Sequence, residues 1–175
     1  MADFDINQIA STLDSEDMIG FTRAFVEDIR KGLNAVNVDR YPWIEEIGNG
    51  QWQGVLALGM GGSAAGGDFL SSICDLQGSI PVVVQRDYVI PAWWHDQWLV
   101  IATSHSGNTE EAIEATEIAL KSGATVIVIS TGGILSGLAE LHYNCYLIPS
   151  IGGQPPRSAF GHIFGRQLAL FRCLG

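Results

Sequence analysis

Two short stretches of small and hydroxyl-bearing residues lie about forty residues apart in this 175-residue chain. Residues 59–63 (GMGGS) follow the apolar run 54–58, and residues 104–109 (SHSGNT) follow the apolar run 98–103. A strand that leads through such a turn into a helix presents unpaired backbone N–H groups and the positive end of the helix dipole. Each stretch therefore has the chemistry of a cradle for a phosphate-sized anion.

The candidate phosphate ligands from the two stretches are Gly61, Gly62, Ser63, Ser104, Ser106 and Thr109. The glycines let the backbone approach a ligand closely, and the other side chains offer hydroxyl donors. Either stretch alone is equally well explained as a tight turn that needs glycine and capping residues. The two together favour a single anionic ligand held from both sides.

Two nucleotide-binding motifs fit the first stretch poorly. No Lys follows Gly62 and Ser63, so the stretch is not a P-loop. Residues 59–64 form a degenerate dinucleotide fingerprint, and Asp87 stands where a ribose-binding acid would, but a dinucleotide needs no second hydroxyl-rich turn. A phosphorylated small molecule explains both turns, without a cofactor or a metal.

A third stretch, residues 152–158 (GGQPPRS), follows the last apolar run and carries Arg157 at the start of the final helical pattern. An arginine is the natural cation for a phosphate or for a developing enediolate oxygen. The glycines and prolines here are equally compatible with a plain loop. Arg86 is the competing cation, and we interpret it as a surface residue.

The elements that position these residues follow from the apolar pattern. Predicted strands are rich in Val, Ile and Leu and lie at residues 54–58, 80–85, 98–103, 125–130 and 145–148. Predicted helices lie at residues 63–73, 109–122, 134–141 and 158–174. Continuous apolar strands that alternate with helices predict an α/β fold, a three-layer doubly wound sandwich with a five-stranded parallel sheet in the order 2-1-3-4-5. Such a sheet binds ligands where its order reverses, beyond the first and third strands, which precede the two cradles.

The N-terminal part has its own pattern. Residues 15–33 have helical apolar spacing, with Asp14 and Ser15 as cap candidates. A polar, turn-prone stretch with Pro42 follows, and we predict that it wraps the core. The chain thus divides into an N-terminal helical segment that packs on the domain, residues 1–53, and the α/β domain, residues 54–175.

The helix predicted at residues 109–122 carries clear end signals. Asn108 and Glu111 resemble a capping box, Glu117 and Lys121 have the spacing of an i,i+4 ion pair, and Gly123 is a candidate stop. These acids are explained by capping and solubility rather than by catalysis.

Composition and net charge limit the classes of molecule that this chain can bind. The net charge is −10, and the chain has 47% hydrophobic and 16% charged residues, without a run of Lys or Arg. Nucleic acid and anionic membranes are therefore excluded as partners, because binding to either requires a basic surface patch. The three widely spaced cysteines are expected to be free thiols of a cytoplasmic protein.

Three motifs together resemble one enzyme family: residues 59–68 (GMGGSAAGGD), 104–111 (SHSGNTEE) and 152–159 (GGQPPRSA). They look like the first sugar isomerase (SIS) domain of the bifunctional phosphoglucose/phosphomannose isomerases, in that family's order and spacing. The resemblance runs from about Leu33 to the C-terminus. The middle motif is shared by SIS domains broadly, whereas the first and third together are far more specific.

The resemblance implies an aldose–ketose isomerase that converts glucose 6-phosphate or mannose 6-phosphate to fructose 6-phosphate through a cis-enediol. It implies that Arg157 stabilises the enediolate, and that the hexose phosphate is held by Ser63, Ser104, Ser106 and Thr109. His105 stands where the family usually has Tyr. We interpret His105 as a loop variant, with a ring-opening proton donor as the alternative.

Family members carry a second SIS domain, which the resemblance implies supplies the base Glu, a ring-opening His and a Lys. No carboxylate follows Glu140, so we expect this chain alone to bind sugar phosphate weakly and not to isomerise it. SIS domains pair, so a homodimer or pairing with a second SIS domain is expected, with Trp93, Trp94 and Trp98 as candidate contact surface unless they pack in the core. The alternatives are a non-catalytic sugar-phosphate sensor, although no basic recognition helix is present, and a structural oligomerisation domain.

Overall fold

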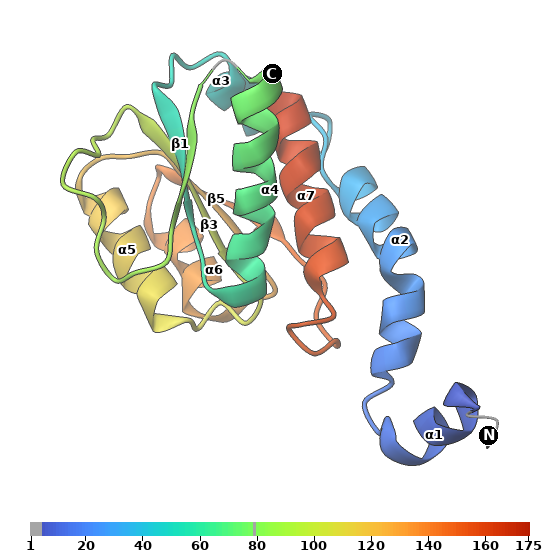
Figure 1. Ribbon diagram of the computed structural model, residues 1–175. Coiled ribbons are helices and arrows are strands. Elements are labelled where there is room, and N and C mark those ends of the chain that lie inside the picture. The colour runs from blue at the N-terminus through green and yellow to red at the C-terminus, as the bar shows by residue number, and fades with distance from the viewer. Residues whose placement is uncertain (1–4, 79) are drawn as a thin grey trace.

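The computed structural model describes residues 5–78 and 80–175. Its centre is a five-stranded parallel sheet in the order β2-β1-β3-β4-β5 (Figure 1). The strands are β1 (Gly54–Leu58), β2 (Val82–Gln85), β3 (Trp98–Ser104), β4 (Val126–Ser130) and β5 (Cys145–Pro149). The predicted fold class and strand order are therefore confirmed.

Helices connect and cover the strands. In chain order they are α1 (Ile6–Leu13), α2 (Met18–Ala35), α3 (Trp43–Gly48), α4 (Gly61–Gln77), α5 (Glu110–Lys121), α6 (Gly133–Leu141) and α7 (Phe160–Leu174). Each of β1, β3 and β4 leads into the helix that follows it, which is the alternation that a parallel sheet requires.

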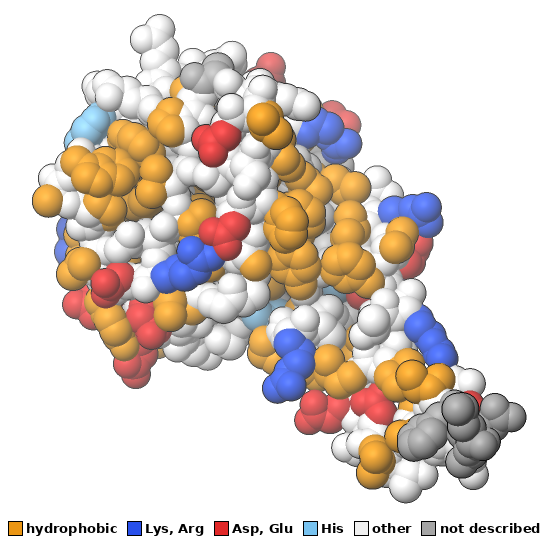
Figure 2. Space-filling view, viewed as in Figure 1, with side chains coloured by type: hydrophobic (Ala, Val, Ile, Leu, Met, Phe, Trp, Pro, Cys, Tyr) orange, Lys and Arg blue, Asp and Glu red, His pale blue; other side chains and the backbone are white. Residues whose placement is uncertain are grey.

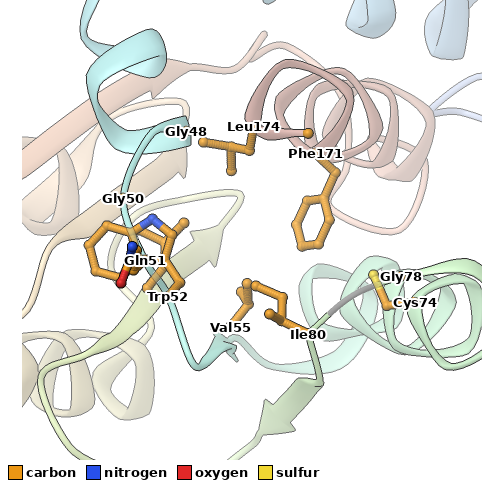
Figure 3. Close-up of a pocket in the computed structure, with 12 residues that line it drawn as sticks. Gly48, Gly50, Gln51, Trp52, Val55, Cys74, Gly78, Ile80, Phe171 and Leu174 are labelled. Atoms are coloured by element: carbon orange, nitrogen blue, oxygen red, sulfur yellow. The ribbon is translucent and has the colours of Figure 1, made fainter.

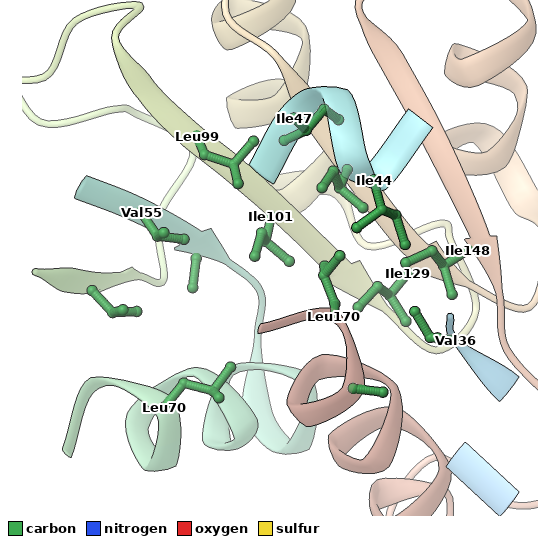
Figure 4. Packing of buried hydrophobic residues seen from close by; sticks show 14 residues of the cluster. Val36, Ile44, Ile47, Val55, Leu70, Leu99, Ile101, Ile129, Ile148 and Leu170 are labelled. Atoms are coloured by element: carbon green, nitrogen blue, oxygen red, sulfur yellow. The ribbon is translucent and has the colours of Figure 1, made fainter. Parts of the chain in front are cut away.

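Burial of both sheet faces explains why the strands lack polar alternation. Every residue of β1 and β4 is buried. Ile101 and Ile129 point to one face, where they pack with Leu70 of α4, Leu170 of α7 and the residues of α3 (Figure 4). Their neighbours along the strands point to the other face and pack with α5 and α6. A parallel sheet with both faces covered selects continuous Val, Ile and Leu.

The long helix α2 packs along α7 at close range. A Cβ on Gly32 of α2 would lie 2.8 Å from the carbonyl oxygen of His162, and one on Gly165 of α7 would lie 2.5 Å from that of Ile29. Glycine is required at both positions because the two backbones approach too closely for a side chain. The contact fixes α2 against the domain, whereas α1 extends away and buries none of its residues (Figure 1).

Residues between α2 and β1 belong to the same core as the sheet. Val36 and Ile44 are fully buried and pack in the cluster beneath α7. The segment with Pro42 therefore wraps the core. Within it residues 43–48 form the helix α3, although the sequence predicts only a turn-prone stretch there.

The ends of two predicted helices differ from expectation. The capping box at α5 is wrong: the side chain of its N-cap residue Thr109 makes no cap hydrogen bond, and Asn108 instead accepts from the backbone N–H of Ile134 (Asn108 Oδ1–Ile134 N, 3.1 Å) at the start of α6. Helix α4 begins at Gly61, two residues before the expected start. The stop at Gly123 is confirmed, with a φ of +88°.

Surface features of the helices agree with their amphipathic sequences. Lys121 lies 2.9 Å from Glu117, as predicted. No helix in residues 5–78 or 80–175 has the length and apolar character to cross a membrane. Figure 2 shows apolar side chains gathered over α4 and α7, where Phe69, Ile73 and Leu76 are exposed and Phe69 packs its ring against those of Phe160 and Phe164.

Candidate functional site

The two cradles and the Arg157 loop line one cleft at the carboxyl end of the sheet. The cleft has a volume of about 410 Å³ and is lined by Met60, Gly61, Gly62, Ser63, His105, Ser106, Thr109, Pro156 and Arg157. These residues follow β1, β3 and β5. The first two of these strands flank the point where the strand order reverses, so the cleft lies where doubly wound sheets bind ligands.

The first cradle is the N-terminus of α4. The earliest N–H groups of an α-helix have no partner within the helix, and in α4 they belong to Gly61 and Gly62. Gly61 needs glycine because its φ is +51°. Gly62 has no such need, since its φ is ordinary and a Cβ there would meet no protein atom within 4 Å. Its missing side chain leaves the backbone open to the cleft.

Gly59 brings the first cradle close to the second. A Cβ at Gly59 would lie 3.0 Å from the carbonyl oxygen of Thr103 at the end of β3. A larger residue would push the start of α4 away from β3. The glycine therefore sets the width of the cleft.

The second cradle is a turn closed by its own hydroxyls. Ser104 Oγ lies 2.9 Å from Thr109 Oγ1 and accepts from the N–H of Gly107 at 3.1 Å. Ser106 Oγ accepts from the N–H of Asn108 at 3.2 Å. Gly107 has a φ of +70°, and a Cβ there would lie 1.8 Å from the carbonyl oxygen of Gly132, so only glycine fits.

The structure does not bring Ser104 to the cleft. Its side chain belongs to the last residue of β3 and is 1% exposed, and its hydroxyl is used inside the turn. Ser106 and Thr109, in contrast, line the cleft. Ser104 thus holds the shape of the turn, and the hydroxyls available to a ligand here are those of Ser106 and Thr109.

Arg157 supplies positive charge at the cleft. It is exposed, and in the described part of the chain no carboxylate forms an ion pair with it. The competing cation Arg86 is exposed on the surface, as expected, and it forms an ion pair with Asp68. No carboxylate is among the described residues that line the cleft, so the cleft favours an anion despite the net charge of −10.

His105 also lines the cleft, although the ligand set predicted from the sequence omits it. Its Nε2 lies 3.1 Å from the carbonyl oxygen of Gln154. A carbonyl only accepts, so Nε2 carries the hydrogen and donates it. His105 thereby joins the second cradle to the loop of Arg157.

A second cavity lies at the opposite, amino-terminal end of the sheet (Figure 3). It measures about 450 Å³ and is lined mainly by apolar side chains, among them Val55, Leu99 and Phe171. The indole N–H of Trp52 already donates to the carbonyl of Ile47. No Lys, Arg or His is among the described residues that line this cavity, so it lacks the positive charge that would attract an anion. Within residues 5–78 and 80–175 no cluster of three His, Cys, Asp or Glu side chains is arranged to bind a metal.

The chain is similar to bifunctional phosphoglucose/phosphomannose isomerases. It is 46% identical to the one of Caldicellulosiruptor bescii over 122 residues, which are 69% of this chain and 35% of that protein. It is 40% identical to the one of Thermoplasma volcanium over 114 residues, 65% of this chain and 35% of that protein. Over these residues the chain resembles the sugar isomerase (SIS) domain of this family. No protein-family profile matches it.

The SIS domain spans about a third of the length of these curated relatives. Its fold is also that of solved structures with low sequence identity. Tagatose-6-phosphate ketose/aldose isomerase from Escherichia coli superposes with a TM-score of 0.68 at 18% identity, covering 88% of this chain and 46% of that one. The Vibrio vulnificus NanR protein complexed with ManNAc-6P superposes with a TM-score of 0.64 at 18% identity, covering 95% and 64%.

Proposed function

We propose that this chain is the sugar-phosphate-binding domain of an aldose–ketose isomerase that interconverts glucose 6-phosphate or mannose 6-phosphate with fructose 6-phosphate. The observation that carries the proposal is the convergence of two anion cradles and one unpaired Arg157 on a single cleft. Similarity to relatives named for both activities supports the same substrate class.

The phosphate lies against the first turn of α4 and the second cradle. The N–H groups of Gly61 and Gly62 and the hydroxyls of Ser63, Ser106 and Thr109 donate to its oxygens. The positive end of the α4 dipole adds to this attraction. Ser104 contributes indirectly, because it holds Thr109 in place.

Arg157 faces the reacting carbons. A base removes the proton from C2 of the aldose and returns it to C1, while the O2 proton moves to O1, through a cis-enediol. The guanidinium stabilises the negative oxygen that develops in this step. The proposal assigns no step to a metal or a cofactor.

The catalytic base that removes the C2 proton is supplied from outside the residues that line the cleft. Supporting this, no Asp or Glu is among the described residues that line the cleft, and Glu110 and Glu111 lie in the first turn of α5. A base must lie within hydrogen-bond reach of its proton. We therefore propose that a second SIS domain, or another copy of this chain, supplies the carboxylate, and that the chain alone binds without isomerising.

Apolar surface supports such pairing. Phe69, Ile73 and Leu76 leave a contiguous exposed patch on α4, beside the rings of α7 (Figure 2). Trp93 is also exposed and packs its ring against Trp98, the centroids lying 4.9 Å apart. Exposed apolar patches of this kind mark protein interfaces.

Exchange of solvent hydrogen tests the proposal. In D₂O, the protein with its partner domain should place deuterium at C2 of glucose 6-phosphate or mannose 6-phosphate, and this chain alone should bind both without exchange. A domain that only senses sugar phosphates would bind them and never exchange in either form. Absence of binding to all three hexose phosphates would remove the proposal altogether.

A further inference from the structure

A buried polar pair joins the two long helices beside the cleft. Asp28 of α2 and His162 of α7 lie with His162 Nε2 3.2 Å from Asp28 Oδ1, and both side chains are 3% exposed. Burial lowers the pKa of His162, although Asp28 opposes this shift, so the ring is neutral near pH 7 and Nε2–H donates to the carboxylate. A carboxylate buried this deeply needs several donors.

Gln154 is a second donor to the same carboxylate. Its side-chain Nε2 lies 3.2 Å from Asp28 Oδ2, across 126 residues of sequence. Lys31 also lies near this carboxylate and carries a positive charge, with its Nζ 3.9 Å from Asp28 Oδ1. Asp28 thus anchors the loop that carries Gln154 to helices α2 and α7.

Gln154 also anchors the loop from its other side. Its backbone carbonyl accepts from Nε2 of His105 at 3.1 Å. Arg157 follows three residues later, and the carbonyl of Pro155 accepts from the N–H of Ser158 at 2.9 Å. The loop is therefore held at Gln154 by one contact from α2 and one from the second cradle, and Arg157 itself is left exposed.

We propose that Asp28 and Gln154 are positioning residues that hold Arg157 over the cleft. The inference rests on the proposed function, since it assigns Arg157 to the ligand. Neither side chain lines the cleft. They act by fixing the loop, which spares Arg157 the entropy cost of ordering when a ligand binds.

Hydrogen exchange of the backbone amides of residues 150–158 tests, without any ligand, whether the side chain of Gln154 fixes this loop. Gln154→Ala should speed exchange of these amides about tenfold, while amides of β3 and β4 keep their wild-type rates. Gln97→Ala is the matched control, because it also removes the side-chain hydrogen bond of a glutamine, here Gln53 Nε2 to Gln97 Oε1 at 2.6 Å, outside the cleft. Unchanged loop exchange in Gln154→Ala overturns the inference, whatever the binding results.

Affinity for fructose 6-phosphate tests the link to Arg157. Gln154→Ala and Asp28→Asn should each weaken binding about tenfold in an otherwise wild-type chain. In an Arg157→Ala background, Gln154→Ala should have almost no further effect, because its role is to place that guanidinium. A purely structural role would lower affinity equally in both backgrounds and would overturn the inference.

The two proposals fail in different ways. If the wild-type chain binds no hexose phosphate, the proposed function fails, and the exchange measurement still decides whether Gln154 holds the loop. If the wild type binds and Gln154→Ala binds equally well, the proposed function stands and the positioning role is refuted. Asp28→Asn provides a second variant, whose melting temperature separates loss of the loop contact from loss of the fold.

Discussion

The substitution Gly62→Ala distinguishes the two explanations of the glycines in the first cradle, which serve either the fold of the turn or the binding of an anion. If Gly62 serves only the fold, alanine should destabilise the protein. In the structure a Cβ at Gly62 meets no protein atom within 4 Å, and φ is not in the left-handed region. Alanine in place of glycine in a helix then adds roughly 0.5 kcal/mol of stability, at the low end of the usual range because Gly62 lies in the first turn.

For a chain of this size, that gain corresponds to a rise of about 1–2 °C in the melting temperature. Affinity should move the opposite way, because the added methyl occupies space beside the N–H groups that face the ligand. We expect about tenfold weaker binding of fructose 6-phosphate, equivalent to about 1.4 kcal/mol.

Gly137→Ala is the matched control for Gly62→Ala. It lies in α6, meets no atom within 4 Å and does not line the cleft. Thermal melts and calorimetric titration of both variants should show two small stability gains and one loss of affinity. Equal affinities in Gly62→Ala and wild type would refute the reasoning, as would a lower melting temperature of Gly62→Ala.

Three further predictions follow from single contacts. Thr109→Val should weaken phosphate binding about tenfold, because it removes one hydroxyl donor. It should also cost roughly 1 kcal/mol of stability, because Ser104 Oγ then keeps only its hydrogen bond from the N–H of Gly107. A variant with wild-type affinity in calorimetry would contradict this prediction. Burial lowers the pKa of His162 below its ordinary value of 6.5, so the stability that the neutral ring supports is complete above pH 6.5 and is lost as the pH falls below 6.5. In urea unfolding, the free-energy advantage of wild type over His162→Gln should therefore shrink from pH 7.5 to pH 5.5. A constant difference would be inconsistent with a buried neutral ring. Burial raises the pKa of Cys145 to about 11, so at pH 8 iodoacetamide should modify the partly exposed Cys173 well before Cys145; equal labelling rates by mass spectrometry would exclude the buried thiol.

The sheet was predictable because its strands are buried on both faces. Such strands contain almost only Val, Ile, Leu and Ala, so the residues of β1 and β4 stand out in the chain. Once the alternation of strands and helices indicated a doubly wound fold, its topology implied that the turns after β1 and β3 share one edge. The two cradles stand out by their glycines and hydroxyl residues, and this topology predicts that they lie at one cleft.

Side-chain direction was not predictable to the same degree. Ser104 belongs to β3, so its hydroxyl turns into the protein, whereas Ser106 and Thr109 stay at the cleft. Asn108 caps α6 rather than α5, because two helices start side by side there. Local sequence spacing carries no information on which neighbouring helix a cap serves.

The contacts of Asp28 were invisible in the sequence for a different reason. They join α2 to Gln154 and to His162 of α7, which both lie more than 120 residues after Asp28 in the chain. Helix α1 is absent from the predicted elements, although the sequence carries a local signal for it. Ile6, Ile9 and Leu13 have helical spacing, and the preceding Asp5 is a capping residue, which accepts from the N–H of Asn7 in the structure.

The most direct test of the central claim is a titration followed by NMR on the backbone amides of both cradles. Addition of fructose 6-phosphate should shift Gly62, Ser63, Ser106 and Thr109 together, with one dissociation constant, and unphosphorylated fructose should shift none of them. Shifts confined to one cradle, or two cradles that saturate at different concentrations, would show that they do not hold the same phosphate.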